Sequence, residues 1–206
     1  MKKYKFITFE GVEGCGKSTQ SKLLADFLSK NDIPVLLTRE PGGTEVAEEI
    51  RKILVNGEVN KLDGITETLL NFAARKDHIE KLIKPAIAQN KIVISDRFFD
   101  STIAYQGYGH KVNLEDIKSI HKSSIGDFEP DITFLIDVEI ESTSRRIVNR
   151  PENNRYEAMD LYFHKRVQRG FEEISKSDNR RFRVINGNRS IEDIHRNILF
   201  CLDLEN

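Results

Sequence analysis

The sequence predicts an α/β protein in which a mostly parallel β-sheet is flanked by helices on both faces. Short apolar segments alternate with longer helical patterns along the chain, the order expected of parallel strands joined by crossover helices. Segments such as IVIS and ITFLI are apolar without polar alternation, which suits strands buried on both sides. The 206 residues, 38% hydrophobic and 32% charged, are enough for one domain with its own core. We therefore predict a single domain over residues 1–206.

Each element follows from a local pattern. The predicted strands are Lys5–Glu10, Pro34–Thr38, Ile92–Asp96, Ile132–Asp137 and Arg183–Ile185. The predicted helices are Lys17–Lys30, Glu45–Val55, Thr66–Gln89, Leu114–Lys122, Ile140–Arg150, Glu157–Lys176 and Ile191–Leu204. The polar segment Arg150–Tyr156, interrupted by Pro151, is predicted to be a mobile loop.

Composition excludes several classes of partner. The net charge is −1, so no overall field favours nucleic acid or a membrane surface, and an anion site must be a local cluster of cations. No apolar stretch approaches the roughly 18 residues of a membrane-spanning helix, and the first residues do not form a signal peptide. Cys15 and Cys201 lie far apart, which argues against a disulfide framework or a zinc site. We expect a cytoplasmic protein.

A glycine-rich turn follows the first predicted strand. The segment Gly11–Ser18, GVEGCGKS, fits the complete pattern G-x-x-x-x-G-K-[ST] between an apolar strand and a helix. Backbone N–H groups of such a loop surround a nucleotide phosphate, Lys17 reaches the β- and γ-phosphates, and the Ser18 hydroxyl faces Mg²⁺. The alternative, a glycine turn that only caps a helix, does not require the whole pattern. The predicted phosphate-binding residues are Gly11, Val12, Glu13, Gly14, Cys15, Gly16, Lys17, Ser18 and Thr19.

The segment Asn60–Asp63, NKLD, matches a guanine-reading pattern of GTPases. A GTPase would also need a D-x-x-G segment between the phosphate loop and this motif, and no Asp of the chain has Gly three places later. We therefore interpret Asn60–Asp63 as a polar loop between two helices.

A second anion site is predicted at the carboxyl ends of the strands. Arg39 directly follows the second predicted strand. Asp96 is the last residue of the third predicted strand, and Arg97 follows it. Ligands of open α/β sheets bind at these ends, so the three side chains should converge on the phosphate loop. Arginines bind phosphate through paired, charge-assisted hydrogen bonds, and Asp96 resembles a carboxylate that acts on Mg²⁺. The alternative for Asp96 and Arg97 is a structural ion pair.

Three further residues suit a nucleobase. Phe72 and Arg75 are one helical turn apart, so a ring and a guanidinium can share a face that stacks on a base and donates to its carbonyl. Gln106 offers both a donor and an acceptor to a base edge. Taken singly, Phe72 could be a core residue, and Arg75 or Arg51 a solvated helix charge.

The motifs GVEGCGKSTQ, TREPGGT, FAAR…H and DRFFDSTIAYQG, with a late arginine-rich loop, together resemble bacterial thymidylate kinases from about Phe6 to Phe171. The resemblance implies the P-loop nucleoside monophosphate kinase fold, a three-layer arrangement with a five-stranded parallel sheet and a short arginine-rich lid at about residues 145–157. It implies Mg²⁺-dependent phosphoryl transfer from ATP to dTMP, and a homodimer.

The resemblance also implies roles for individual residues. Arg39 and Arg97 match residues around the acceptor phosphate, and Glu13 matches an acid near the acceptor 3′-hydroxyl. Phe72, Arg75 and Gln106 match the thymine pocket, although some relatives place the stacking ring where this chain has Asn71. The residues expected to bind dTMP are Glu13, Arg39, Arg51, Phe72, Arg75, Arg97, Ser101, Tyr105 and Gln106.

The catalytic cations follow from the same resemblance. Some relatives carry an arginine in the phosphate loop, and this chain does not, so the lid should supply one. The lid region contains Arg145, Arg146, Arg150 and Arg155, of which the last two are preferred. The predicted catalytic residues are Lys17, Arg97, Arg150 and Arg155, and the predicted Mg²⁺ ligands are Ser18 and Asp96, the latter directly or through water.

Two alternatives remain at this point. One is a kinase for UMP or CMP, against which the Arg75 and Gln106 pair and the AYQG segment argue. The other is a nucleotide-dependent switch that binds ATP and moves no phosphate; the acceptor site and the missing D-x-x-G segment disfavour it.

Overall fold

The computed structural model describes residues 4–139 and 155–204. Its five strands form one sheet with the order β2-β3-β1-β4-β5, and every neighbouring pair is parallel. The strands are β1 (Phe6–Glu10), β2 (Val35–Arg39), β3 (Ile92–Asp96), β4 (Ile132–Asp137) and β5 (Phe182–Asn186). The predicted five-stranded parallel sheet is therefore confirmed.

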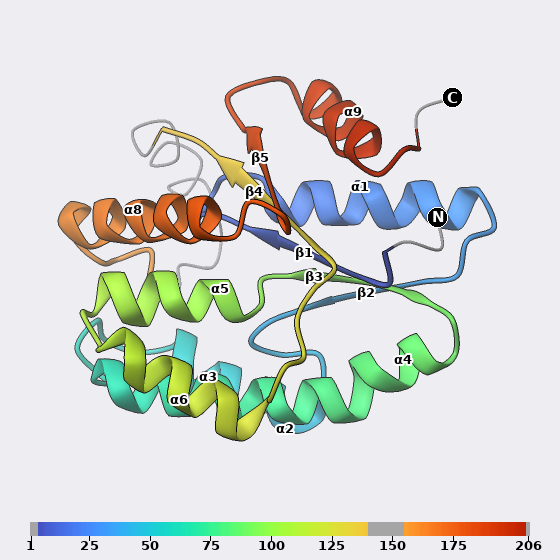
Figure 1. Ribbon diagram of the computed structural model, residues 1–206. Helices are drawn as coiled ribbons and strands as arrows, with labels where there is room; N and C mark the ends of the chain where they lie inside the picture. Colours follow the sequence, from blue (N-terminus) through green and yellow to red (C-terminus); the bar gives the residue numbers. More distant parts are fainter. Residues whose placement is uncertain (1–3, 140–154, 205–206) are drawn as a thin grey trace.

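Helices cover both faces of this sheet (Figure 1). In Figure 1, α1 runs alongside the strands and α9 lies above α1, whereas α2, α3, α4 and α6 lie below the strands. The helices are α1 (Lys17–Lys30), α2 (Glu45–Val55), α3 (Gly64–His78), α4 (Lys84–Ala88), α5 (Phe99–Thr102), α6 (Leu114–Ser124), α8 (Leu161–Ser177) and α9 (Ile191–Cys201), with π-helical segments η1 (Ile79–Ile83) and η2 (Ile103–Gly109). Helix α8 packs along η2 and also contacts α5 and β5.

Capping residues explain where two helices begin. The predicted helix Thr66–Gln89 is the succession of α3, η1 and α4, and it begins at Gly64 because the Asp63 side chain accepts hydrogen bonds from Ile65 N and Thr66 N, both at 2.9 Å. The segment Asn60–Asp63 joins α2 to α3, as predicted. Helix α8 begins four residues after its predicted start, because Asp160 caps it at Phe163 N. The predicted helix Ile140–Arg150 lies outside the described residues.

The prediction missed α5 and η2, which follow shortly after β3: β3 ends at Asp96 and α5 begins at Phe99. This stretch contains Gly107 and Gly109, which weaken a helical pattern. Both glycines are required by close packing: a Cβ on Gly107 would lie 2.5 Å from Leu114, and one on Gly109 would lie 2.7 Å from Phe163. The glycines therefore allow neighbouring elements to approach, and they do not end the helix.

The apolar core lies on both sides of the central strands. All five residues of β1 are buried, and Phe9 and Phe134 of neighbouring strands pack with their ring centroids 5.3 Å apart. Leu24 and Leu28 of α1 fill the layer above, and neither is exposed to solvent. The predicted burial of β3 and β4 is confirmed, because parallel strands between helical layers have no solvent face. Within the described ranges, no helix is long and apolar enough to cross a membrane.

The register of the strands brings the predicted polar residues together. Arg39 at the end of β2 is paired with Asp96 at the end of β3, and Phe9 of β1 is paired with the same Asp96. Because the strands are parallel, the loops that follow them leave the sheet at one edge. The predicted convergence of Arg39, Asp96 and the phosphate loop is confirmed.

Candidate active site

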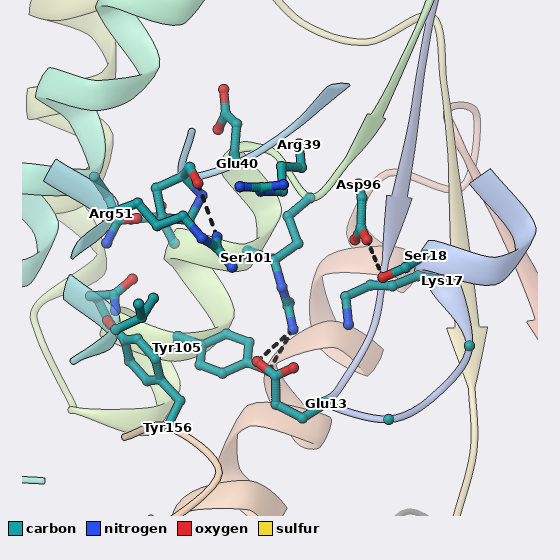
Figure 2. Close-up of a pocket in the computed structure, with 18 of the residues that line it drawn as sticks. Glu13, Lys17, Ser18, Arg39, Glu40, Arg51, Asp96, Ser101, Tyr105 and Tyr156 are labelled. Carbon is teal, nitrogen blue, oxygen red and sulfur yellow. Dashed lines mark hydrogen bonds and ion pairs between the residues drawn. The ribbon is translucent and has the colours of Figure 1, made fainter. Parts of the chain in front are cut away.

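A cavity opens at this edge of the sheet (Figure 2). The phosphate loop and the start of α1 form one end of it, and the ends of β2 and β3 with side chains of α2, α3, α5 and η2 form the other. Figure 2 shows Lys17, Ser18 and Asp96 on the opposite side from Tyr105 and Tyr156. The lining residues are Glu13, Gly14, Gly16, Lys17, Ser18, Thr19, Arg39, Glu40, Pro41, Arg51, Val55, Asn71, Asp96, Arg97, Ser101, Thr102, Tyr105, Gln106 and Tyr156.

The phosphate loop depends on its glycines. Gly16 has φ 103° and precedes the first residue of α1, so only glycine fits this turn without strain. At Gly11, which has φ 141°, a Cβ would lie 2.7 Å from the carbonyl oxygen of Ile136 and 2.8 Å from Cys15 Sγ. Cys15 is only 1% exposed, so its side chain fills the space beneath the loop. The loop therefore turns its backbone toward the N-terminal end of α1, where anions bind.

Lys17 and Ser18 occupy the first turn of α1. Lys17 is buried, with 5% exposure, and its Nζ donates to the carbonyl oxygen of Val12 at 3.1 Å. The Ser18 hydroxyl donates to Asp96 Oδ2, and Asp96 Oδ1 is buried with no hydrogen-bond partner in the described part of the chain. A hydroxyl and a carboxylate oxygen are donors that suit Mg²⁺, and the unpartnered oxygen supplies a reason for a cation here. The residues predicted to hold a metal thus fit one.

Three guanidinium groups gather at the far side of the phosphate loop. Arg51 of α2 donates to the carbonyl oxygen of Pro41 at 3.0 Å, and Arg39 pairs with Glu48 at 3.0 Å on the outer rim. Burial, followed by the nearby charge of Arg39, lowers the pKa of Arg51. The positive charge of Arg97 acts in the same direction. Like charges held this close form a site for an anion.

Arg97 connects the two ends of the cavity. Its Nη2 donates to Glu13 Oε1 at 2.8 Å and to the Tyr105 hydroxyl at 3.1 Å, and its Nη1 donates to Ser101 Oγ at 2.9 Å. Burial opposes the charged form, but Glu13, Tyr105, Asp96 and Glu10 together outweigh it and hold the pKa of Arg97 well above its usual value. The backbone of Arg97 has φ 74°, an uncommon conformation for a side chain with a Cβ that is found preferentially at functional sites.

Glu10 was not among the predicted site residues. It ends β1, is fully buried, and accepts hydrogen bonds from Phe98 N at 2.8 Å and Ser101 Oγ at 2.6 Å. Burial, reinforced by the charge of Asp100, raises its pKa to about 8. Glu10 thereby fixes the turn that carries Arg97. An acid at the end of an otherwise apolar strand, one residue before the phosphate loop, is the sequence signal that identifies it.

Arg75 lies behind the cavity in a buried polar network. It is 2% exposed; its Nε donates to Glu40 Oε2 at 2.7 Å, and its Nη2 donates to Phe98 O and to Thr102 Oγ1, both at 3.1 Å. His78 contacts the other oxygen of Glu40 at 3.0 Å. The Arg75 Nη1 group has no hydrogen-bond partner among the residues that the structure describes. Two of its partners, Glu40 and Thr102, line the cavity, whereas Arg75 is not among the lining residues.

The structure corrects the prediction for Phe72. Its ring is 2% exposed and packs against Phe99 and His121, with centroids 5.9 Å from each, so it belongs to the layer between α3, α5 and α6. Asn71, the preceding residue, lines the cavity instead. A rotation of one residue is 100° around a helix, which is why neighbours face different surroundings. Phe72 therefore does not offer a stacking face to a ligand in this cavity.

The prediction for Arg155 as a lid cation is also corrected. The Arg155 side chain is fully buried and forms an ion pair with Glu67 of α3, which is fully buried as well. Its other donors reach the carbonyl oxygens of Leu54 and Val59. A guanidinium held by three protein acceptors is not available to a phosphate. The other arginines predicted for the lid, Arg145, Arg146 and Arg150, lie outside the described residues.

Comparison with known proteins agrees with this geometry. The family model described as thymidylate kinase matches residues 9–198. A thymidylate kinase of Wolbachia pipientis is 46% identical over 192 residues, covering 92% of this chain and 94% of the relative, and one of Exiguobacterium sibiricum is 39% identical over 199 residues, covering 97% and 93%. A crystal structure of thymidylate kinase from Ehrlichia chaffeensis superposes with a TM-score of 0.76 at 41% identity, covering 96% of this chain and 97% of that one. This chain belongs to the thymidylate kinase family.

Proposed function

We propose that this chain transfers the γ-phosphoryl group of ATP to dTMP, giving ADP and dTDP. The observation that carries the proposal is a single cavity with two anion sites. One is the complete phosphate loop with Lys17, and the other is the cluster of Arg39, Arg51 and Arg97. A kinase needs both, because donor and acceptor each bring a charged phosphate to one place.

The reaction joins two phosphates. An oxygen of the dTMP phosphate bonds to the γ-phosphorus of ATP, and the bond from that phosphorus to the β,γ-bridging oxygen breaks, so that ADP leaves with the electron pair. The acceptor phosphate has a second pKa of about 6 and is mostly dianionic at neutral pH, so no side chain has to remove a proton. Lys17 and Arg97 hold the reacting phosphates in place and stabilise the charge that spreads over them.

Ser18 and Asp96 would hold Mg²⁺, which neutralises charge on the nucleotide phosphates when it is bound. With Arg155 engaged by Glu67, the sequence leaves Arg150 as the preferred lid arginine for the transferred group. A lid cation stabilises the phosphoryl group and excludes water from it.

The acceptor base is thymine in this proposal. The Nη1 group of Arg75, for which the described residues supply no acceptor, is a donor that would suit the O4 carbonyl of thymine. Cytosine carries an amino group at that position, so its N–H donor would face the N–H donor of Arg75. Tyr105 and Ser101, which both contact Arg97, lie where the sugar and phosphate of the acceptor would enter.

A monophosphate panel tests the proposal. Purified protein, ATP and Mg²⁺ are combined in turn with dTMP, dUMP, UMP and CMP, and ADP formation is measured. We expect the highest kcat/KM with dTMP. A preference for UMP or CMP would identify a different monophosphate kinase, and ATP binding without transfer to any acceptor would identify a binding protein.

We also propose a homodimer through α2 and α3, which pack side by side. Four large apolar side chains of these helices are 42–52% exposed: Val46, Ile53, Ile65 and Leu69. Apolar side chains on adjacent helices suit a self-complementary interface. Light scattering after size exclusion tests this, with Leu69→Glu expected to give monomers.

Cys15 and Cys201 are unpaired thiols, which fits the proposed cytoplasmic location.

A further inference from the structure

A carboxylate that does not line the cavity organises part of its wall. Glu67 of α3 is fully buried, and the sequence patterns did not single it out. It accepts hydrogen bonds from Gln106 Nε2 at 2.8 Å and from the Tyr156 hydroxyl at 3.0 Å, it pairs with Arg155, and its Oε2 lies 3.3 Å from His110 Nε2. Gln106 and Tyr156 both line the cavity. Glu67 thus lies directly behind two of the residues that a ligand would meet.

The contact with Glu67 fixes which way the Gln106 amide points. An ionised carboxylate only accepts hydrogen bonds, so the NH₂ group of Gln106 must face it. Burial favours the neutral acid, but the contacts from His110, Arg155 and Gln106 outweigh burial and lower the pKa of Glu67. A rotated amide would place its carbonyl oxygen against the carboxylate at this distance. The carbonyl oxygen therefore lies on the side of the amide away from Glu67, and Gln106 lines the cavity.

Arg155 ties the same carboxylate to the end of α2. Its backbone N–H donates to Val55 O at 3.0 Å, and its side chain donates to the carbonyl oxygens of Leu54 and Val59. These carbonyls belong to the last turn of α2 and to the loop after it, where helical carbonyl groups lack partners within the helix. The pair of Arg155 and Glu67 therefore holds the chain at residue 155 against α2 and α3.

Tyr156 follows Arg155 and is held in the same way. Its hydroxyl contacts Glu67, and its ring meets that of Tyr105 edge to face with centroids 5.7 Å apart. Figure 2 shows the two rings side by side at one end of the cavity. The Glu67 carboxylate thus positions both the Tyr156 ring, which is part of the cavity wall, and the Gln106 amide.

We propose that Glu67 is a positioning residue for the acceptor base: it presents the Gln106 carbonyl to the N3–H group of thymine and holds Tyr156 against the base. The inference rests on the proposed function. Thymine has a donor at N3 where cytosine has an acceptor, so a Gln106 amide that cannot rotate rejects cytosine. Selectivity at N3 is in this way set by a residue that never touches the substrate.

The variant Glu67→Gln tests this directly. An amide at position 67 can donate to the Gln106 carbonyl, which allows the Gln106 NH₂ group to turn toward the cavity. We expect the KM for dTMP to rise about tenfold and the ratio of kcat/KM for dTMP over dCMP to fall about tenfold, the scale of one mispaired hydrogen bond. The KM for ATP should stay within about twofold, because the phosphate loop does not contact Glu67.

Neutralising Glu67 alone leaves Arg155 buried without its partner, which can unfold the protein. The double variant Glu67→Gln/Arg155→Met removes both charges and is expected to show the same two changes. Glu115→Gln is the matched control, since Glu115 makes the same kind of contact to a lysine on an exposed helix face and is 76% exposed. It should match the wild type in all three quantities.

Three results would overturn the proposal. The first is a folded double variant whose KM for dTMP and dTMP-over-dCMP ratio are unchanged. The second is a loss that falls equally on ATP and dTMP, which indicates a general structural role. The third is a double variant that does not fold, because a positioning residue must be removable from a folded enzyme. The wild-type protein tests the proposed function separately: if it does not phosphorylate dTMP, the proposed function fails before any variant is compared.

Discussion

The two ends of the cavity are built in different ways. The donor end is one continuous segment, Gly11–Ser18, whose shape comes from glycine backbone and the start of α1. The acceptor end is assembled from six separate elements between residues 35 and 109: β2, α2, α3, β3, α5 and η2. Phosphate binding can therefore be encoded by a short sequence motif, whereas recognition of the acceptor depends on tertiary structure.

Buried acidic side chains hold the acceptor end together. Glu10 fixes the turn that carries Arg97, Glu40 orients Arg75, and Glu67 orients Gln106. Each of the three is at most 4% exposed. Changes at the donor end should therefore affect turnover, and changes behind the acceptor end should affect stability and substrate choice.

The largest effect is expected at the donor end. Lys17→Ala removes the cation nearest the transferred phosphate, so kcat should fall by at least about 100-fold. The circular dichroism spectrum should be unchanged. Lys22→Ala, on the exposed face of the same helix, is the control and should keep wild-type turnover. Near-normal turnover in Lys17→Ala would refute the assignment of this loop to the donor.

A change behind the acceptor end should reduce stability first. Glu40→Gln leaves Arg75 buried beside a neutral group, and breaking a buried ion pair costs about 3–5 kcal/mol of unfolding free energy. Glu48→Gln breaks the pair with Arg39 at the exposed rim and should cost less than about 1 kcal/mol. Urea denaturation of both variants measures the difference. Equal losses of unfolding free energy would show that burial does not determine how much each ion pair contributes to stability.

Neighbouring residues of α3 should separate packing from binding. Phe72→Leu reduces contact with Phe99 and His121 and should lower the unfolding free energy by about 1 kcal/mol, with the KM for dTMP unchanged. Asn71→Ala should leave stability nearly unchanged and raise the KM for dTMP about three- to tenfold. The opposite outcome, a KM effect from Phe72→Leu alone, would restore Phe72 as the ring that contacts the base.

The smallest effect concerns pH. Burial, and then the charge of Arg75, lowers the pKa of His121 from 6.5 to about 4. Its ring packs on Phe99 with centroids 3.9 Å apart. The folded protein therefore binds fewer protons than the unfolded chain, and the stability from His121 is present above pH 6.5 and is lost as the pH falls toward 4. NMR titration of the His121 ring measures the pKa; a midpoint near 6.5 would contradict this environment.

Features with a local cause could be predicted from the sequence. The strands are continuous apolar runs, the phosphate loop is contiguous, and parallel strands place their carboxyl ends together, which brought Arg39 to Asp96. A separate argument from side-chain chemistry predicts Arg75 and Gln106 for a base edge; Gln106 lines the cavity, and Arg75 lies behind it.

Features that depend on distant partners could not be predicted. Helical spacing places Phe72 and Arg75 near each other but does not say what surrounds them. The Phe72 ring packs in the layer under α6, and Arg75 lies in the buried network with Glu40. The partner of Arg155 is Glu67, 88 residues earlier, so nothing near Arg155 distinguishes a buried arginine from a lid cation. Helix α5 and η2 were missed because the glycines of η2, which serve close packing, weaken the helical pattern of this stretch.

The burial of Cys15 provides a natural reporter of the phosphate loop. Its sulfur lies under Gly11, so a thiol reagent can reach it only when the loop leaves its folded conformation. Cys201, on the partly exposed end of α9, would react without that opening and serves as an internal reference. The labelling rate of Cys15 relative to Cys201 therefore measures how often the loop opens, in the unmodified protein and without an added probe.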